Sequence, residues 1–354
     1  MKLDDLLSNV GEWLRGTGAN SNIVMSSRIR LARNLPDIAF PHWAKKEQEL
    51  MVIKKAKQAI EATPLLRDSL FIDLADLETV DKQFLVERHL MSREHAMRSN
   101  SKAVCITPNE VISIMVNEED HLRIQVMKSG FDLDDVWKIT NCLDDDISKV
   151  VPFAFSKNWG YLTACPTNTG TGMRGSVMLH LPALVMTRQI NRVLEAIAKL
   201  SFTTRGLYGE GTQATGNFFQ ISNQVSLGHT EEEIIGNIKG VIKQIIEQEE
   251  NARQNLLSHH RNMLEDRIWR SYGILKNSRI ITSQETVELL SMVRLGLDLQ
   301  IIKDIQIFLI NELFILTQPA HLQKIEGKRL TPQERDTKRA DLLREKLNKE
   351  KKSK

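Results

Sequence analysis

Three short runs of β-branched and apolar residues lie between residues 103 and 127, and they constrain the fold more than any other feature of the chain. The runs are AVCIT (103–107), VISIMV (111–116) and LRIQVM (122–127), and the polar segment NEEDH separates the last two. Strand-like runs that flank a few polar residues predict an antiparallel hairpin. Glu118 and Glu119 then lie at the tip of the hairpin or just beyond a strand end.

The rest of the chain alternates between helical and strand-like spacing without regular βαβ order. Helical spacing occurs at 44–62, 78–90, 132–151 and 182–200, and strand-like runs occur at 161–165, 176–181 and 217–228. Thr230 and Glu233 form a capping box that opens a long helix to about residue 258. This order predicts an α+β fold with an antiparallel sheet flanked by helices.

After the last strand-like run the pattern becomes almost wholly helical. We therefore expect one domain over residues 1–255 and an all-helical C-terminal domain over 256–354, with residues 318–331 as a linker before a final charged helix. The apolar stretch 301–316 is interrupted by Lys303, Asp304 and Glu312, so it predicts a buried helix and no membrane span.

Composition narrows the class of protein. The chain has 354 residues, of which 41% are hydrophobic and 26% charged, and this balance is typical of a soluble globular enzyme. Its net charge of +3 is too small and too scattered to favour nucleic acid as a partner. The three cysteines form no pair at C-x-x-C spacing, and the N-terminus lacks the apolar core of a signal peptide. We expect a cytoplasmic protein without a protein-bound metal.

A glycine-rich segment at 170–175 matches the pattern G-x-G-x-x-G. A dinucleotide-binding loop of that pattern must be followed directly by a helix, but SVMLHL (176–181) has strand character. The P-loop pattern is absent from the sequence. Phosphate must therefore be bound by other means.

Five arginines stand in contexts that suit phosphate binding. Arg28 and Arg30 alternate along an extended segment, Arg123 follows the acidic turn, Arg174 lies in the glycine-rich segment, and Arg205 precedes another glycine-rich stretch. Arginine binds phosphate through paired hydrogen bonds, and glycine allows a close backbone approach. A surface ion pair explains any one of them equally well, but the five together favour a triphosphate site.

The segment Asn117-Glu118-Glu119-Asp120 has two interpretations. Most polar segments of this kind simply form the solvated tip of a hairpin. In the functional interpretation, the two glutamates are a pair of carboxylates that holds a cationic substrate. Cys165, directly before Pro166, is likewise either a buried inert thiol or a reactive thiolate beside the arginines.

Taken in order, these motifs resemble the phosphagen (guanidino) kinase family. The segments that carry the resemblance are SSRIRLARN (26–34), NEEDH (117–121), CPTNTGTGMRGSV (165–177), RG with a glycine loop (205–211) and SNQVSLG (222–228). The similarity covers roughly residues 20–255. It is greatest to the bacterial members that phosphorylate arginine in proteins, because SSRIR begins at residue 26, without the helical domain that precedes it in the small-molecule kinases. RGLYGEG and the C-terminal ERDTKRA (334–340) agree with this branch, and one departure is Gly175, where alanine is expected.

The resemblance implies the roles of individual residues. Glu118 and Glu119 would hold the acceptor guanidinium, with Cys165 beside it. The resemblance implies ATP with Mg²⁺ as the cofactor, the metal being held mainly through the phosphates. The ATP site would consist of Ser26, Ser27, Arg28, Ile29, Arg30, His89, Arg123, Arg174, Gly175, Ser176, Val177, Met178, Arg205, Gly206, Leu207, Tyr208, Gly209 and Glu210.

The implied reaction is ATP-dependent phosphorylation of arginine residues in proteins, which would mark those proteins for a Clp-type protease and regulate a stress response. Arg335, Asp336, Arg339 and Ala340 would dock phosphoarginine, although a solvated helix face explains the same residues without the family. The implied partners are proteins with an exposed arginine, an activator protein, a Clp-type AAA+ unfoldase and a second copy of the chain. The alternatives are a kinase of small guanidino compounds and a non-catalytic adaptor that binds phosphoarginine.

Overall fold

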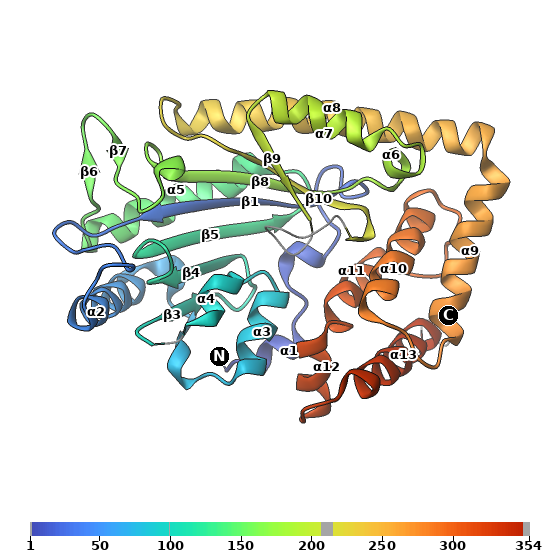
Figure 1. The fold of residues 1–354 in the computed structure, drawn as a ribbon, viewed down its shortest axis with the longest axis horizontal. Helices are drawn as coiled ribbons and strands as arrows, with labels where there is room; N and C mark the ends of the chain where they lie inside the picture. The colour runs from blue at the N-terminus through green and yellow to red at the C-terminus, as the bar shows by residue number, and fades with distance from the viewer. Residues whose placement is uncertain (1, 99, 207–214, 350–354) are drawn as a thin grey trace.

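A computed structural model describes residues 2–98, 100–206 and 215–349 of the chain (Figure 1). Its main element is an eight-stranded sheet in which every neighbouring pair is antiparallel, in the order β2-β3-β4-β5-β1-β8-β10-β9. The strands are β1 (Val24–Arg33), β2 (Leu70–Asp73), β3 (Ala103–Ile106), β4 (Ile112–Val116), β5 (Leu122–Ser129), β8 (Met173–His180), β9 (Phe202–Arg205) and β10 (Phe218–Asn223), and β6 (Phe155–Ser156) and β7 (Gly160–Tyr161) form a separate hairpin.

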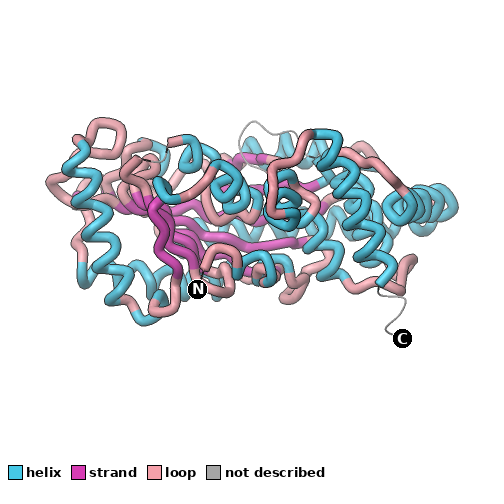
Figure 2. The backbone as a smooth tube through the Cα atoms, turned by 90° about the horizontal axis from the view of Figure 1, so that it is seen from below, coloured by secondary structure: helices cyan, strands magenta, loops and turns pink. Residues whose placement is uncertain are grey.

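Helices flank this sheet and then continue alone to the C-terminus, which confirms the predicted fold class. The helices over the first part are α1 (Asp5–Ser8), α2 (Lys46–Ala62), α3 (Thr79–Glu87), α4 (Arg93–Met97), α5 (Leu133–Val150), α6 (Pro182–Met186) and α7 (Ile190–Lys199). The later helices are α8 (Glu231–His259), α9 (Arg261–Asn277), α10 (Ser283–Asp298), α11 (Ile307–Leu316), α12 (Pro319–Glu326) and α13 (Pro332–Lys349). Figures 1 and 2 show α9 to α13 beside one end of the sheet.

The central strand β1 shows why the sheet has one apolar and one polar face. Successive side chains of a strand point to opposite faces, so Ile29 and Leu31 lie on one side and Arg28 and Arg30 on the other. Ile29 and Leu31 are fully buried. Helix α5 packs against β1 and β5 and helix α8 against β8 and β10, so that the apolar face is covered. The arginine face is left for the site.

The hairpin predicted from residues 103–127 is present as β3, β4 and β5, with Asn117–His121 as the connection between β4 and β5. Asn117 takes a positive φ of 61° there, and its backbone N–H donates to the carbonyl of His121 at 2.9 Å. The side-chain amide of Asn117 donates to the carbonyls of Glu49 and Ser101, both at 2.9 Å. The turn that carries the acidic residues is therefore fixed from several sides.

Three sequence expectations need correction. The helix expected over 182–200 is two helices, because the chain turns between α6 and α7 with Arg188 at a φ of 59°. The linker expected over 318–331 contains the helix α12. Strand β8 begins at Met173, so Arg174 and Gly175 are strand residues and not part of the glycine-rich loop.

None of the helices within the described ranges combines the length and the apolar character that crossing a membrane requires.

Candidate active site

The register of the sheet brings the predicted arginines onto one face. Arg30 of β1 lies directly opposite Arg174 of β8, and Arg28 lies opposite Ser176. Directly paired residues of an antiparallel sheet point to the same side. Arg123 of β5 pairs with Ala32, two residues beyond Arg30, and so points to this side as well. The alternation of the three strands thus builds a single basic surface.

Arg205 joins this surface from the edge of the sheet. It pairs with Gln220 of β10, which pairs with Met178 of β8, which pairs with Ser26 of β1. Arg205 is therefore in phase with Arg28 and Arg30, although the strands β9 and β1 are not neighbours.

Neutral groups hold several of these guanidiniums in place. Arg28 donates from Nε to Ser176 Oγ at 3.3 Å, and Arg174 donates to Ser222 Oγ at 3.3 Å and to Thr203 Oγ1 at 2.9 Å. The Nε and Nη2 atoms of Arg30 are buried without a hydrogen-bond partner. Buried cations and unpaired donors are costly, so this surface suits a polyanion.

The pKa values of Arg28 and Arg205 on this surface are lowered. Burial, followed by the positive charge of Arg123 and its neighbours, lowers the pKa of Arg28 to about 9. Burial and the charges of Arg174 and Arg123 lower the pKa of Arg205 to about 10. Arginine normally titrates above about 12, so burial first and mutual repulsion second disfavour the charged guanidiniums, and a bound phosphate chain would offset both.

Glu118 is buried in the turn between β4 and β5 and already holds a guanidinium. Arg123 Nη1 donates to Glu118 Oε2 at 2.5 Å, and the hydroxyl of Ser92 donates to Glu118 Oε1. Burial raises the pKa of Glu118, but the charge and hydrogen bonds of Arg123 and the hydrogen bond from Ser92 outweigh it and bring the pKa to about 2. Glu118 is therefore a permanent anion.

Glu119 and Asp120 have the opposite electrostatic environment. Burial and the neighbouring charge of Asp120 raise the pKa of Glu119 above its ordinary value, and burial also raises that of Asp120. Adjacent carboxylates whose pKa values are pushed apart are suited to different tasks. Glu118 is suited to binding a cation, and Glu119 is suited to accepting a proton.

Cys165 ends the loop that faces this turn. It is half-buried, and its Sγ lies 3.0 Å from Thr167 Oγ1 within the short helical turn Pro166–Asn168. Gly172, at a φ of 66°, brings the loop so close to β1 that a Cβ atom would lie 2.7 Å from the carbonyl oxygen of Ala32. Glycine is required there, so the glycine-rich sequence fixes a loop and does not cradle a dinucleotide.

One cavity of about 1080 Å³ is lined by nine of the predicted site residues. The predicted site residues that line it are Arg28, Arg30, His89, Glu118, Glu119, Arg123, Cys165, Arg174 and Arg205. The five arginines and the two glutamates, which are far apart in the sequence, therefore share one space.

The remaining predicted residues divide into three groups. Ser26, Ser176 and Met178 line a small recess that shares Arg28, His89 and Gln220 with the cavity. Ser27, Ile29, Gly175 and Val177 alternate with the arginine-face residues and point to the other face, where a Cβ atom on Gly175 would meet Ile238 at 2.5 Å. Gly206 is described at the end of β9, whereas Leu207, Tyr208, Gly209 and Glu210 lie outside the described residues.

Sequence reasoning missed several residues of the site. Trp13 lines the recess and contacts the His89 ring edge to face at 5.1 Å, and Ser92 and Gln220 also line this region. No local signal marks Trp13, because its place depends on packing against a residue 76 positions later. Alternation along 218–223 could have identified Gln220 as a residue of the arginine face.

The C-terminal motif lies on α13, away from the cavity. Arg339 is buried, and it donates to the carbonyls of Thr317 at 2.8 Å and Ile281 at 2.9 Å and to Asp336 Oδ1 at 2.5 Å. Arg335 is half-buried and donates to the carbonyl of Leu330 at 2.9 Å, and Ala340 is fully buried. In this arrangement Arg339 holds α13 in place, and the docking role of the motif remains a prediction.

The donor groups of the cavity suit Mg²⁺ held by phosphates better than a protein-bound ion. Within residues 2–98, 100–206 and 215–349 there is no cluster of three or more histidine, cysteine or acidic side chains with the geometry of a metal site. Mg²⁺ commonly keeps water ligands and binds through substrate phosphates. The arginine face would bind those phosphates.

Comparison with known proteins gives two family matches. Residues 51–252 match the family described as ATP:guanido phosphotransferase, C-terminal catalytic domain. Residues 261–354 match the family described as Protein-arginine kinase McsB C-terminal domain. The turn with Glu118 and Glu119, Cys165 and the segment around Arg174 all fall within the first match.

Curated relatives match along nearly the whole chain. A protein-arginine kinase from Halothermothrix orenii is 50% identical over 349 residues, covering 98% of this chain and all of the relative. A protein-arginine kinase from Desulforamulus reducens is 49% identical over 352 residues, covering 98% and 99% of the two chains.

Solved structures show the same fold. The duplicated taurocyamine kinase from Schistosoma mansoni, with bound transition state analog components, matches with a TM-score of 0.60 and 27% identity over 69% of this chain and 35% of that chain. A lombricine kinase matches with a TM-score of 0.58 and 23% identity over 73% of this chain and 71% of that one, and this match concerns the fold alone. The chain therefore belongs to the ATP:guanido phosphotransferase family, as its resemblance to the phosphagen kinases predicted, and it is a kinase with a guanidino acceptor.

Proposed function

We propose that this enzyme transfers the γ-phosphoryl group of ATP to the guanidinium of arginine residues in proteins. The observation that carries the proposal is that one cavity is lined by five arginines and by Glu118 and Glu119. The curated relatives, named protein-arginine kinases, support arginine in a protein as the acceptor.

At the donor end the sheet supplies the charge stabilisation. Arg28, Arg30 and Arg174 project from neighbouring strands, with Arg123 and Arg205 on either side. Phosphoryl transfer depends mostly on positioning and on stabilising charge over the phosphate oxygens. Mg²⁺ bound to the phosphates would neutralise further charge there.

At the acceptor end Glu118 and Glu119 have different roles in the proposed reaction. The ion pair with Arg123 shows that Glu118 binds a guanidinium, and its low pKa keeps it charged. In the reaction an acceptor Nη atom forms a bond to the γ-phosphorus, the bond from phosphorus to the bridging oxygen of ADP breaks, and the guanidinium loses one proton. Glu119, whose pKa is raised, accepts that proton.

Exposed residues in the cavity lining are consistent with an acceptor on a polypeptide. Met97, which is 81% exposed, and His42, which is also exposed, both line the cavity, so part of its lining is accessible from solvent.

Mass spectrometry tests the proposal. Incubation with ATP, Mg²⁺ and an arginine-rich protein, worked up without acid, should give phosphate on arginine. A P–N bond breaks in acid because protonation of nitrogen creates a good leaving group, so the label should disappear in warm acid. Acid-stable label would indicate a hydroxyl acceptor, and label on free arginine alone would indicate a small-molecule kinase.

We extend the proposal to the partners that the resemblance implies. A docked phosphoarginine at α13, a second copy of the chain, an activator protein and a Clp-type AAA+ unfoldase would connect the modification to protein degradation under stress, in the cytoplasm. Co-purification of the unfoldase with phosphorylated but not with unmodified substrate would support this extension, and equal recovery would contradict it.

A further inference from the structure

Asn34 lies where β1 ends, and its side chain joins three segments around the acceptor end of the cavity. The amide Nδ2 donates to Asp120 Oδ1 at 2.6 Å and to the carbonyl of Leu162 at 3.0 Å. Its Oδ1 accepts from the backbone N–H of His121 at 2.9 Å. The orientation of the amide is determined by these partners, because a carboxylate and a carbonyl can only accept and a backbone N–H can only donate.

The backbone around Asn34 extends the same connection. The carbonyl of Asn34 accepts from the N–H of Ala154 at 2.7 Å, and the N–H of Leu35 donates to His121 Nδ1 at 3.0 Å. His121 Nε2 then donates to the carbonyl of Ala39 at 2.8 Å. The end of β1 is thereby bonded to both the acidic turn and the segment that leads to Cys165.

Asp120 completes the link between the two halves of the acceptor site. Its Oδ1 accepts from Asn34 and also from the backbone N–H of Ala164 at 2.7 Å. Ala164 directly precedes Cys165, and Asp120 directly follows Glu119. Asn34 and Asp120 are 2% and 4% exposed, so no water competes for these bonds.

We infer that Asn34 is a positioning residue for phosphoryl transfer: it sets the distance and orientation of Glu119 and Cys165 relative to the arginines of β1. The same strand carries Arg28 and Arg30 at the donor end, six and four residues earlier, respectively. Asn34 therefore fixes the acceptor end of the cavity to the strand that binds phosphate. This inference rests on the proposed function.

The loss of Asn34 should act on turnover and on the acceptor, not on ATP. Asn34→Ala removes the bonds that hold Asp120 and Leu162 but leaves the arginine face unchanged. A misplacement of about 1 Å can reduce a rate about 100-fold, so we expect kcat to fall by about 10- to 100-fold. The KM for the protein acceptor should rise, whereas the KM for ATP should stay within about twofold.

Two further variants test which group of the contact matters. Asn34→Asp places two carboxylates together and removes the donor, so it should be at least as inactive as Asn34→Ala. Asp120→Asn keeps an oxygen that can accept from both Asn34 and Ala164, so it should keep kcat within about threefold of the parent.

Asn311→Ala is the matched control for lost stability. Asn311 is also fully buried, and its amide accepts from Arg294 Nε at 3.1 Å and donates to the carbonyl of Leu14 at 3.0 Å, outside the cavity. This variant should lower the unfolding temperature and leave the acceptor KM unchanged.

The measurements are phosphoarginine formation at varied acceptor and ATP concentrations, ATP-analogue binding and thermal unfolding. Asn34 variants with parental kcat and acceptor KM would overturn the inference, and so would an equal loss of nucleotide affinity or an Asp120→Asn variant as impaired as Asn34→Asp. A parent that forms no phosphoarginine would remove the proposed function and this inference with it, whereas an active parent with unaffected Asn34 variants would remove the inference alone. If Asn34→Ala does not fold, the comparison of Asn34→Asp with Asp120→Asn decides.

Discussion

The adjacent residues Glu118 and Glu119 have different surroundings in the cavity. Glu118 is buried against Arg123 and Ser92, whereas Glu119 is half-buried beside Asp120 and has no such ion pair within the described contacts. The pKa of Glu118 is about 2, and that of Glu119 is raised. In the proposed reaction the same residue type would therefore provide an anion and a base a single position apart.

Glu119→Gln should abolish transfer while nucleotide binding persists. The loss should exceed the roughly 10²–10⁴-fold that one general base contributes, because Gln also orients a guanidinium less well. In the parent, activity should fall as the pH falls through the raised pKa of Glu119, since the protonated carboxyl cannot accept a proton. Rates measured from neutral pH downward into acid should show that acidic limb in the parent.

Glu118→Gln serves as the contrast to this variant. Glu118, with a pKa of about 2, titrates at lower pH than that limb, so this substitution should raise the acceptor KM and leave the acidic limb in place. Near-parental turnover of Glu119→Gln, or the loss of the acidic limb in Glu118→Gln, would contradict the assignment.

At the residue scale the sequence predicted the charged groups but not their connections. The arginines and glutamates have a visible pattern, because strand alternation and a polar turn are local. Asn34 and Trp13 do not, because each acts through a partner about 76 to 128 positions away in the chain. Such contacts arise only when the sheet has closed, so no local spacing reports them.

At the element scale the sequence predicted what local periodicity determines. The strands β3, β4 and β5 and the capped start of α8 follow from alternation and from the Thr230–Glu233 capping box. The helix α12 was missed although Pro319 at its first position and Gly327 at its C-cap are local signals of a helix. What the sequence does not report is the cap of its N-terminus, because the Glu87 carboxylate of α3 accepts from the N–H groups of Ala320 at 2.8 Å and His321 at 3.0 Å.

Arg335 and Arg339 of α13 stand four residues apart in the sequence but have different environments in the structure. Arg339→Ala leaves two buried carbonyls without a donor, so it should lower the free energy of unfolding by about 1–3 kcal/mol for each group. Arg335→Ala loses one half-buried bond and should change stability by less than about 1 kcal/mol. Urea unfolding of both variants tests this ranking, and equal stabilities would contradict it.

The same pair tests the docking prediction cleanly. Because Arg339→Ala perturbs the packing of α13, only Arg335→Ala can separate docking from folding. If α13 binds phosphoarginine, Arg335→Ala should retain basal transfer and lose activation by added phosphoarginine. Full activation of this variant would mean that Arg335 belongs to a solvated helix face and has no part in docking.

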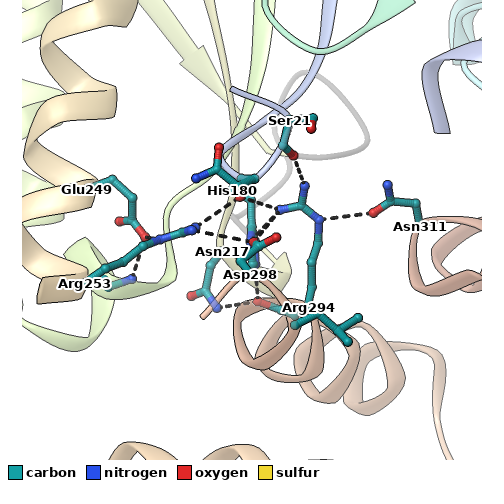
Figure 3. A network of polar contacts seen from close by, with 12 residues as sticks. Ser21, His180, Asn217, Glu249, Arg253, Arg294, Asp298 and Asn311 are labelled. Carbon is teal, nitrogen blue, oxygen red and sulfur yellow. Dashed lines mark hydrogen bonds and ion pairs between the residues drawn. The ribbon is translucent and has the colours of Figure 1, made fainter. Parts of the chain in front are cut away.

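At the scale of the whole molecule, a buried polar network joins the sheet to the C-terminal helices (Figure 3). Arg294 of α10 donates to the carbonyls of Ser21 at 2.7 Å and Asn22 at 3.3 Å, to His180 Nδ1 at 2.8 Å and to Asn311 Oδ1 at 3.1 Å. Burial and the charges of Arg294 and Arg253 hold the pKa of His180 well below its ordinary value, so the ring is neutral and can accept.

Two carboxylates, Glu249 and Asp298, balance the charges of this network through three ion pairs. Arg253 of α8 binds Glu249 at 2.9 Å, and Asp298 lies 3.6 Å from both Arg253 and Arg294. Ser21 and Asn22 lead directly into β1, and His180 ends β8. The two strands that carry the central arginines are thus anchored in the C-terminal helices, so the two parts of the chain should unfold as one unit.

Arg294→Ala should destabilise the sheet and the C-terminal helices together. Removing one partner of a buried ionic network costs about 3–5 kcal/mol, because Asp298 and several carbonyls lose their partner in a dry interior. Urea unfolding followed by helical circular dichroism and by binding of an ATP analogue should give coincident midpoints in the parent, and both midpoints should fall together in the variant. The control is Arg270→Ala, since Arg270 forms the same i, i+4 pair with Asp266 at 3.9 Å but is 75% exposed, and it should change the free energy by about 0–1 kcal/mol. If the parent loses analogue binding well before it loses helix, or if the two substitutions cost the same, the network does not couple the two parts.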